Sequence, residues 1–281
     1  MPELPEVETI VRRLASLIKG KSINKISVLR EKSFAGDPEK IAGMPIVAVS
    51  RRAKLIRLHL PENHNLLVHL KMTGQLIYLD ETQKIGGGHP TADWVQALPS
   101  SHTRIVFDLS DKATLYFNDM RVFGWVRALD DEQVQLEFDK YGPDIVDDSV
   151  TLEYLLEKFS RTARPVKLAI MDNAIVSGVG NIYASDALNL AQINPAKPAK
   201  DLAPEEVQKL LTSSKFVINL GIESGGATID NYKHVDGFSG SYQDKVLAYG
   251  REGEECQQCG GTIVRAKIGG RSAFFCRDCQ V

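Results

Sequence analysis

The stretch CQQCGGTIVRAKIGGRSAFFCRDC, residues 256–279, contains all four cysteines of the chain in two Cys-x-x-Cys pairs. Sixteen residues, 260–275, separate the two pairs. This spacing suits two turns that each offer two thiolates to one tetrahedral Zn²⁺, with a β-hairpin between them. Two disulfides in a secreted protein are the alternative, but no signal peptide is recognisable and disulfides are scarce in reducing compartments. We therefore expect a zinc ribbon with one structural Zn²⁺ and the ligands Cys256, Cys259, Cys276 and Cys279.

The segment between the cysteine pairs is basic. It carries Arg265, Lys267 and Arg271, and no acidic residue stands between positions 262 and 276. Cations on a compact hairpin can contact a phosphate backbone. A solvated basic hairpin without a partner is the alternative that these residues alone leave open.

The charges of the 281-residue chain nearly balance, with a formal net charge of −2. They are nevertheless segregated, because Arg51, Arg52, Lys54 and Arg57 lie in one stretch and acidic residues gather elsewhere, as at 130–132. Local basic faces on a nearly neutral protein allow phosphate binding without general adhesion to polyanions. No apolar run approaches the roughly 20 residues of a membrane span, so we expect a cytoplasmic protein.

The N-terminal segment predicts an amphipathic helix. Apolar residues recur at helical spacing from position 7 to position 18. Pro5 suits the first turn of this helix and Gly20 suits its end. A helix that packs one face on a sheet would also hold Pro2 and Glu3 in place, where chain termini otherwise fray.

Short segments with strand character follow the helix and are separated by turns. They cover residues 22–29, 46–50, 55–60, 66–70, 75–79, 104–109, 114–118 and 123–128. Eight short strands predict a β-sandwich or a barrel. Residues 80–101, with three consecutive glycines, are expected to form a long loop.

After about residue 130 the pattern changes to helices. Helical spacing marks residues 151–159, 166–171, 180–190 and 204–222. Glycines 178 and 180 precede the third of these helices, whose N-terminal amides could accept a phosphate backbone. Taken alone, this helix–turn–helix signal is weak.

The first residues also carry a possible nucleophile. Removal of Met1 before Pro2 would leave a free secondary amine, and α-amino groups are partly unprotonated near neutral pH. Such an amine can attack an aldehyde-like carbon and form an iminium ion, while the neighbouring Glu3 could transfer protons. From position alone, the simpler interpretation of Pro2 as a residue preceding a helix is favoured.

Six motifs, in order along nearly the whole chain, resemble the formamidopyrimidine-DNA glycosylase family. They are PELPEVE (2–8), RRAK (51–54), HLKMTG (69–74), NDMRVFG (118–124), GVGNIYA (178–184) and the four-cysteine tail. The resemblance implies a base-excision-repair enzyme that removes oxidised purines, 8-oxoguanine and formamidopyrimidines, from double-stranded DNA. It also implies a bacterial cytoplasmic enzyme that associates with the nucleoid through DNA, and we expect a monomer.

The resemblance assigns four catalytic residues. In that family the N-terminal proline attacks C1′ of the damaged nucleotide, and the iminium ion then undergoes β- and δ-elimination. Pro2 matches this nucleophile, Glu3 the adjacent general acid/base, and Lys54 the lysine that donates a proton in β-elimination. Arg271 matches a ribbon arginine assigned to δ-elimination, a role that we interpret as mainly electrostatic because arginine keeps its proton.

The resemblance also assigns DNA contacts. The residues that fill the space left by the flipped nucleotide are Met72, Arg121 and Phe123. An apolar wedge replaces lost stacking, and an arginine can bind the base left opposite. His102 and Asn181 match contacts to the DNA backbone, Lys167 is expected near them, and the loop 226–242 matches the segment that closes over the damaged base.

The family fold is an α+β arrangement in three parts. It implies an N-terminal helix on a two-layered β-sandwich for residues 1–130 and a helix–two-turn–helix domain with the capping loop for 131–243. The zinc ribbon would then occupy 244–281. The chain departs from the usual family pattern at Val122, Ala163 and Asp186, which bears on lesion preference and affinity more than on the chemistry.

Two other functions remain to be weighed. The related endonuclease VIII, which acts on oxidised pyrimidines, typically has glycine where Leu4 stands and uses a different void-filling set. A DNA-binding protein without catalysis would need no nucleophile, so Pro2, Glu3 and Lys54 argue against it. If Met1 were retained, however, the Pro2 nitrogen would be an amide and only binding would be possible.

Overall fold

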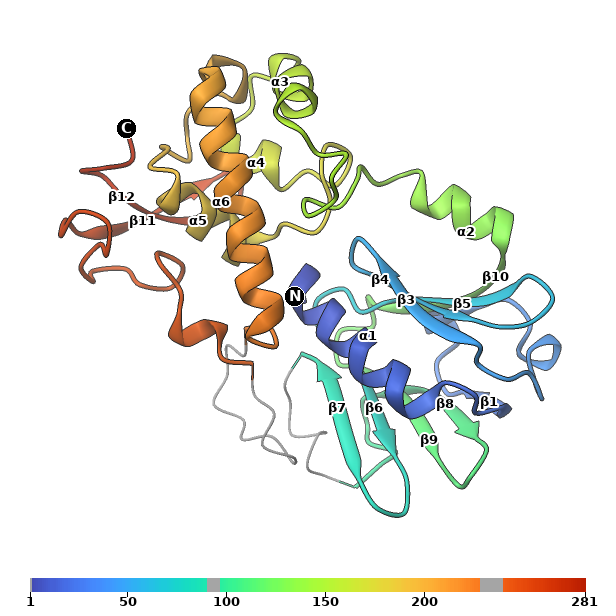
Figure 1. The fold of residues 1–281 in the computed structure, drawn as a ribbon. Helices are drawn as coiled ribbons and strands as arrows, with labels where there is room; N and C mark the ends of the chain where they lie inside the picture. The colour runs from blue at the N-terminus through green and yellow to red at the C-terminus, as the bar shows by residue number, and fades with distance from the viewer. Residues whose placement is uncertain (1, 90–96, 228–239) are drawn as a thin grey trace. The chain divides into compact units, whose positions relative to one another are not determined.

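The computed structural model describes residues 2–89, 97–227 and 240–281. The chain divides into two compact units. Unit 1 comprises residues 1–139 with 225–241, and unit 2 comprises residues 140–224 with 242–281. Figure 1 shows the elements of each unit, coloured along the chain.

Unit 1 is a β-sandwich with a helix along one side. Helix α1 (Leu4–Ile18) is followed by strands that form two five-stranded sheets, ordered β1-β8-β9-β6-β7 and β2-β10-β5-β4-β3. The strands of the first sheet are β1 (Ile23–Val28), β6 (Gly74–Leu79), β7 (Lys84–Gly88), β8 (Thr103–Leu109) and β9 (Thr114–Asp119). Those of the second are β2 (Phe34–Ala35), β3 (Ala48–Arg52), β4 (Leu55–His59), β5 (His64–His69) and β10 (Trp125–Asp130).

The core of unit 1 follows from the periodicity of its elements. Strand β8 buries every second residue, as expected of a strand with one face on the core. Helix α1 buries one face, including Val7, Ile10 and Leu14, and contacts β3 and β7, the edge strands of the two sheets. The helix therefore shields the sandwich where its edges would otherwise be open.

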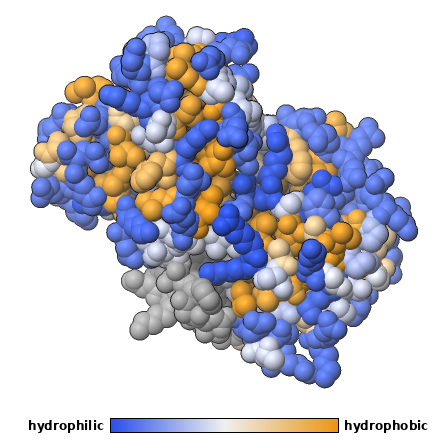
Figure 2. All heavy atoms as spheres, viewed as in Figure 1, coloured by the Kyte–Doolittle hydropathy of each residue, from blue (hydrophilic) through white to orange (hydrophobic). Residues whose placement is uncertain are grey.

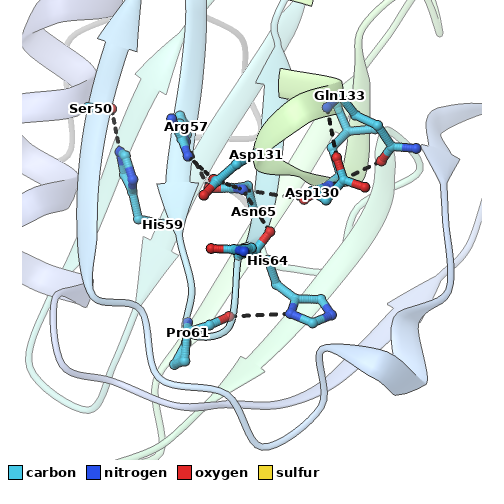
Figure 3. A network of polar contacts seen from close by, with 11 residues as sticks. Ser50, Arg57, His59, Pro61, His64, Asn65, Asp130, Asp131 and Gln133 are labelled. Carbon is cyan, nitrogen blue, oxygen red and sulfur yellow. Dashed lines mark hydrogen bonds and ion pairs between the residues drawn. The ribbon is translucent and has the colours of Figure 1, made fainter. Parts of the chain in front are cut away.

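A polar network joins β4, β5 and the following helix α2 (Asp131–Phe138), as Figure 3 shows. Arg57 donates from Nε to Asn65 and forms a 2.5 Å ion pair with Asp131. Asp130 caps α2 by accepting from the backbone N–H of Gln133, whose side chain accepts from the N–H of Asp130. This reciprocal cap fixes where the sheet ends and the helix starts.

Unit 2, in the part of the chain that the structure describes, contains four α-helices and the cysteine-bearing hairpin. The helices are α3 (Leu152–Ser160), α4 (Val166–Ile170), α5 (Asn181–Leu190) and α6 (Pro204–Glu223), and the hairpin is β11 (Ile263–Ile268) with β12 (Arg271–Cys276). Buried polar side chains join α5 to the hairpin segment: Asn189 donates to Gln280, and Asp186 accepts from Tyr242 and from the N–H of Ala248. Helices and ribbon thus pack as one compact unit.

The α+β fold predicted from the sequence is confirmed. All eight predicted strands, the four later helices and the ribbon hairpin are present, with ends displaced by a few residues. Among the described strands and α-helices, β2, β7 and α2 were missed. Strand β7 lies inside the predicted loop 80–101 because glycines allow close pairing: a Cβ on Gly88 would stand 2.3 Å from the carbonyl oxygen of Gly74.

No helix among the described residues is long and apolar enough to cross a membrane. On the face drawn in Figure 2, hydrophobic residues form patches between hydrophilic ones on each unit. Exposed large apolar side chains include Met72, Met120 and Phe123, which all belong to turns between strands of unit 1.

Candidate DNA-binding and catalytic site

The N-terminus is held in place by a carboxylate in the first turn of α1. Pro2 and Glu3 are buried, and Glu6 accepts a 2.7 Å hydrogen bond from the N–H of Glu3. The other oxygen of Glu6 accepts from the N–H of Ala227, the last described residue before the segment 228–239. The residue that would act as nucleophile thus starts from a fixed backbone.

Lys54 lies in the two-residue turn between β3 and β4. Ala53, its partner in this turn, takes the left-handed conformation with φ of 53°. Arg51 donates to the carbonyl oxygen of Ala53 and pairs with Glu8 of α1 at 2.9 Å. Burial alone would raise the pKa of Glu8, but Arg51 and Arg12 hold that pKa below its ordinary value. The ion pair joins the hairpin of Lys54 to the helix that carries the N-terminus.

His69 is an uncharged residue at the end of β5, directly before the turn that contains Met72. Burial, together with the positive charges of Lys71, Lys54 and Arg127, lowers the pKa of His69 to about 3. The imidazole is therefore uncharged at neutral pH, and its Nδ1 accepts a 3.0 Å hydrogen bond from the N–H of Lys71. This bond shapes the turn that presents Met72.

The turn with Met72 and the turn with Arg121 and Phe123 lie side by side. Gly74 at the start of β6 pairs with Asp119 at the end of β9, so the two turns leave the same end of neighbouring strands. His102 lies at this end too, since its carbonyl oxygen accepts from the N–H of Asp119. Four predicted site residues, far apart in sequence, are thereby brought together.

One fully buried carboxylate, that of Asp119, holds both turns. It accepts hydrogen bonds from the Thr73 hydroxyl and from the backbone N–H groups of Arg121, Phe123 and Gly124. The last two bonds measure 2.8 and 2.6 Å. Because an ionised carboxylate has about four lone-pair sites, Asp119 satisfies three backbone donors and a hydroxyl at once. We call these two turns, held by Asp119, the wedge.

The side chains of the wedge point outward. Met72 is 40% exposed and Phe123 is 50% exposed, in contrast to the core position that residues of these types usually occupy. The guanidinium of Arg121 stacks over the ring of Phe123, 4.7 Å from its centroid. A rigid backbone with exposed apolar tips is suited to entering a base stack.

In unit 2, Asn181 is the first residue of α5, and Lys167 lies on α4. The side-chain oxygen of Asn181 is buried without a hydrogen-bond partner among the described residues. Lys167 is fully buried and donates a 2.7 Å hydrogen bond to Ser185, whose hydroxyl bonds to the carbonyl oxygen of Asn181. Lys167 therefore supports the start of α5 and presents no surface cation, which differs from the expected contact with DNA.

Arg271 is exposed and follows the hairpin turn of the ribbon. Gly269 and Gly270 form this two-residue turn, both at positive φ, as such tight turns require. A Cβ on Gly269 would lie 2.3 Å from the side chain of Leu168. The turn is thus packed against α4 and holds Arg271 at a defined place in unit 2.

The four cysteines form a compact cluster. Their sulfur atoms all lie within 4.8 Å of one another, and none is in a disulfide. The distances from Cys256 to Cys279 and from Cys259 to Cys276 are 3.8 and 3.5 Å. Sulfur ligands at about 2.3 Å from a tetrahedral zinc ion would be separated by about 3.8 Å. The four thiolates fit one structural Zn²⁺, as predicted.

Comparison with known proteins agrees with this geometry along the whole chain. Residues 1–126 match the family model described as formamidopyrimidine-DNA glycosylase N-terminal domain, and residues 141–233 match its H2TH domain. Residues 253–281 match the zinc finger found in FPG and IleRS. The chain belongs to the formamidopyrimidine-DNA glycosylase family. It is accordingly a DNA glycosylase by class.

Several relatives cover the full length. The formamidopyrimidine-DNA glycosylase of Rickettsia bellii is 36% identical over 285 residues, which cover 100% of this chain and 99% of the relative. That of Pelotomaculum thermopropionicum is 35% identical with the same coverage. Among solved structures, the Lactococcus lactis FPG mutant G226P in complex with DNA containing Fapy-dG matches with a TM-score of 0.89, 28% identity and 99% coverage of each chain. The MutM (FPG) protein from Thermus thermophilus matches with a TM-score of 0.85, 31% identity, and 99% and 98% coverage.

Sequence reasoning missed the residues that hold the site. The Asp119 carboxylate, the Thr73 hydroxyl and Glu6 lie within the family motifs, but only the structure shows what they bind. The available signal for this support was an acidic residue, Asp119, directly before an exposed turn, together with a hydroxyl residue, Thr73, in another motif. The capping segment expected at 226–242 lies largely outside the described residues.

Proposed function

We propose that this member of the family is a bifunctional DNA glycosylase and lyase for oxidised purines in duplex DNA. The observation that carries the proposal is the N-terminus: Pro2, which becomes a secondary amine once Met1 is removed, is buried just before α1, and Glu6 holds the backbone N–H of the next residue, Glu3. The family relatives are named for formamidopyrimidine, and a similar structure was solved with DNA that contains Fapy-dG.

In the proposed reaction the Pro2 nitrogen attacks C1′ of the damaged nucleotide, and the bond from C1′ to the base breaks. The base leaves with the bonding electron pair and takes up a proton. The Pro2 nitrogen loses its proton, and the C1′–O4′ bond breaks as O4′ takes up a proton, which opens the sugar ring and gives the iminium ion. This ion then loses the 3′ phosphate by β-elimination and the 5′ phosphate by δ-elimination. Glu3, whose side chain is buried beside the nucleophile, would transfer protons at the sugar.

Lys54 and Arg271 complete the proposed catalytic set. Lys54 would deliver a proton during β-elimination and hold the phosphate beside the lesion. Arg271, exposed on the ribbon, would neutralise the phosphate that leaves in δ-elimination, because its guanidinium stays charged. Zn²⁺ bound by the four cysteines would stabilise the ribbon and supply no step of the reaction.

The wedge gives a physical reason for access to C1′. The damaged nucleotide must leave the stack, which costs a few kcal/mol of lost stacking and pairing. Met72 and Phe123 would fill the space, and Arg121 would bind the base left opposite. His102 and Asn181 would contact the backbone, with Lys167 supporting Asn181 through Ser185. We propose that the protein does this as a monomer, with functional parts at 1–130, 131–243 and 244–281.

Borohydride trapping tests the proposal. Duplexes with 8-oxoguanine opposite cytosine, with an oxidised pyrimidine or with an abasic site are incubated with protein whose intact mass shows that Met1 has been removed. We expect a stable adduct on Pro2 with the 8-oxoguanine duplex, and none after Pro2→Gly with Met1 retained. Preferential trapping on the oxidised pyrimidine would instead indicate an endonuclease VIII-like preference. Absence of any adduct would refute catalysis and leave a damage-binding protein.

A further inference from the structure

A cavity of about 520 Å³ opens directly beside the wedge. Its lining residues in unit 1 include Lys32, Lys71, Met72, Val122, Phe123 and Trp125. The size falls within the range of small-molecule pockets, and an apolar lining with a few polar groups is typical of sites that take a flat ring. Of the residues proposed for the reaction and for DNA binding, Met72 and Phe123 line it, and Pro2, Glu3, Lys54 and Arg271 do not.

The aromatic wall of the cavity is rigid. Trp125 starts β10 and is held between two side chains: the Arg127 guanidinium lies 4.1 Å from its ring centroid, and His69 meets it edge-on at 5.7 Å. Arg127 is itself fixed by an ion pair with Glu137 at 2.8 Å. Trp125 thus offers a stacking surface that needs no rearrangement before a ring binds.

Another residue in the lining of the cavity, Val122, has a strained backbone. Val122 adopts φ of 55°, a conformation that β-branched residues rarely take. The backbone bonds from Arg121 and Phe123 to Asp119 on either side hold it there. Strain of this kind is concentrated at ligand sites. Here it places a branched apolar side chain in the lining of the cavity, together with Met72 and Phe123.

We propose that this cavity binds an undamaged nucleobase, the one that neighbours the base left opposite the lesion. The inference rests on the proposed role of the wedge. Arg121, which is expected to bind the base opposite the lesion, does not line the cavity. The next two residues in the chain, Val122 and Phe123, do line it. If Phe123 enters the stack between those two bases, the second base meets the cavity, and Lys32 and Lys71 in the lining suit the phosphates that flank it.

Photocrosslinking tests this placement. A duplex with a tetrahydrofuran abasic analogue carries 5-iodouracil at the neighbouring position on the undamaged strand or, as a control, about half a helical turn away. Irradiation of the complex should give a crosslink to the peptide with Trp125 from the first position only. Crosslinking of equal yield from both positions, or from neither while the duplex stays bound, would overturn the proposal.

Affinity measurements with matched variants give a second test. Trp125→Ala should weaken binding of the abasic duplex by about tenfold, the loss expected for one stacked base. Val47→Ala, which removes an exposed apolar side chain of unit 1 outside both the cavity and the wedge, should stay within about twofold. If Trp125→Ala proves misfolded by circular dichroism, Val122→Asp serves instead, since its carboxylate would repel the nucleic acid. Unchanged affinity in a folded variant contradicts the proposal.

The two proposals fail separately. Failure of the proposed function would show as absence of the borohydride adduct from wild-type protein with every lesion. Failure of the base site would show as wild-type trapping and excision without the position-specific crosslink. The crosslink uses a duplex that cannot be cut, so it does not depend on the reaction.

Discussion

The wedge of unit 1 and the ribbon turn of unit 2 hold exposed side chains in place in two different ways. The wedge is held by one buried carboxylate that accepts four hydrogen bonds. The ribbon turn belongs to a hairpin whose ends carry four thiolates within 4.8 Å of one another. The first is organised by neighbouring strands of a large sandwich, and the second has only a small apolar cluster of its own.

The difference lies in what the rest of the unit contributes. Unit 1 has a large apolar core, so we expect Asp119 only to select one conformation of two short turns. A two-stranded hairpin is marginal in water, so the ribbon depends on its metal. Loss of the metal should therefore unfold the ribbon locally. Loss of the Asp119 carboxylate should leave the sandwich folded but displace the wedge.

Removal of zinc should have the largest effect. Cys276→Ser replaces a fully buried ligand and leaves three thiolates, and structural zinc binding is worth about 10 kcal/mol or more in small zinc domains. We expect loss of bound zinc by atomic absorption and loss of hydrogen-exchange protection in residues 253–281. Protection in the sandwich should persist. A zinc-free variant whose ribbon stays protected would break the comparison, because the hairpin would then be stable without metal.

Asp119→Asn should have the next largest effect. The amide nitrogen would replace the oxygen that accepts from Phe123 and Gly124, leaving buried donors facing a donor, at a cost of about 3 kcal/mol. Excision should fall at least tenfold, while affinity for undamaged duplex changes little. Thermal unfolding and single-turnover excision measure the two effects.

Variants at Thr73 provide the matched control for Asp119. Thr73→Ser keeps the hydroxyl that donates to Asp119 and should behave as wild type. Thr73→Val keeps the shape but removes the donor, and it should reproduce part of the Asp119→Asn effect. Equal excision rates and equal unfolding temperatures of the Thr73→Ser and Thr73→Val variants would show that the Thr73 hydrogen bond does not position the wedge.

The sequence predicted the parts with local signals and missed those that depend on pairing. Cysteine spacing predicted the ribbon, and periodicity predicted α1 and eight strands, because each is encoded in adjacent residues. Strand β7 was missed since its glycine-rich sequence pairs only by virtue of its neighbour β6. The burial of Lys167 was also unpredictable, because the residue type favours the surface and only its Ser185 partner explains the exception.

Lowering the pH should reduce the stability of the protein through His69, which accepts a hydrogen bond from the turn with Met72. The folded pKa is about 3, below the ordinary value of 6.5, so between these values the unfolded chain binds a proton that the folded chain does not. The contribution of His69 to stability is thus complete above pH 6.5 and is lost as pH falls towards 3. In His69→Asn, whose side-chain oxygen can accept from Lys71, the stability lost between about pH 6.5 and about pH 4.5 should be smaller than in wild type. Parallel pH profiles from urea unfolding would contradict this assignment.

The smallest effects should come from the ribbon turn, where two adjacent glycines allow a controlled comparison. Gly270→Ala places a Cβ in open space at φ of 80°, so only the backbone conformation is penalised, by about 1 kcal/mol. Gly269→Ala adds a contact at 2.3 Å to Leu168, which must move, and should cost more. Combining Gly269→Ala with Leu168→Ala should remove the excess if packing on α4 is its source. An excess that survives in the double variant would mean that the turn is held by the zinc-bound hairpin alone, which would sharpen the contrast with the wedge.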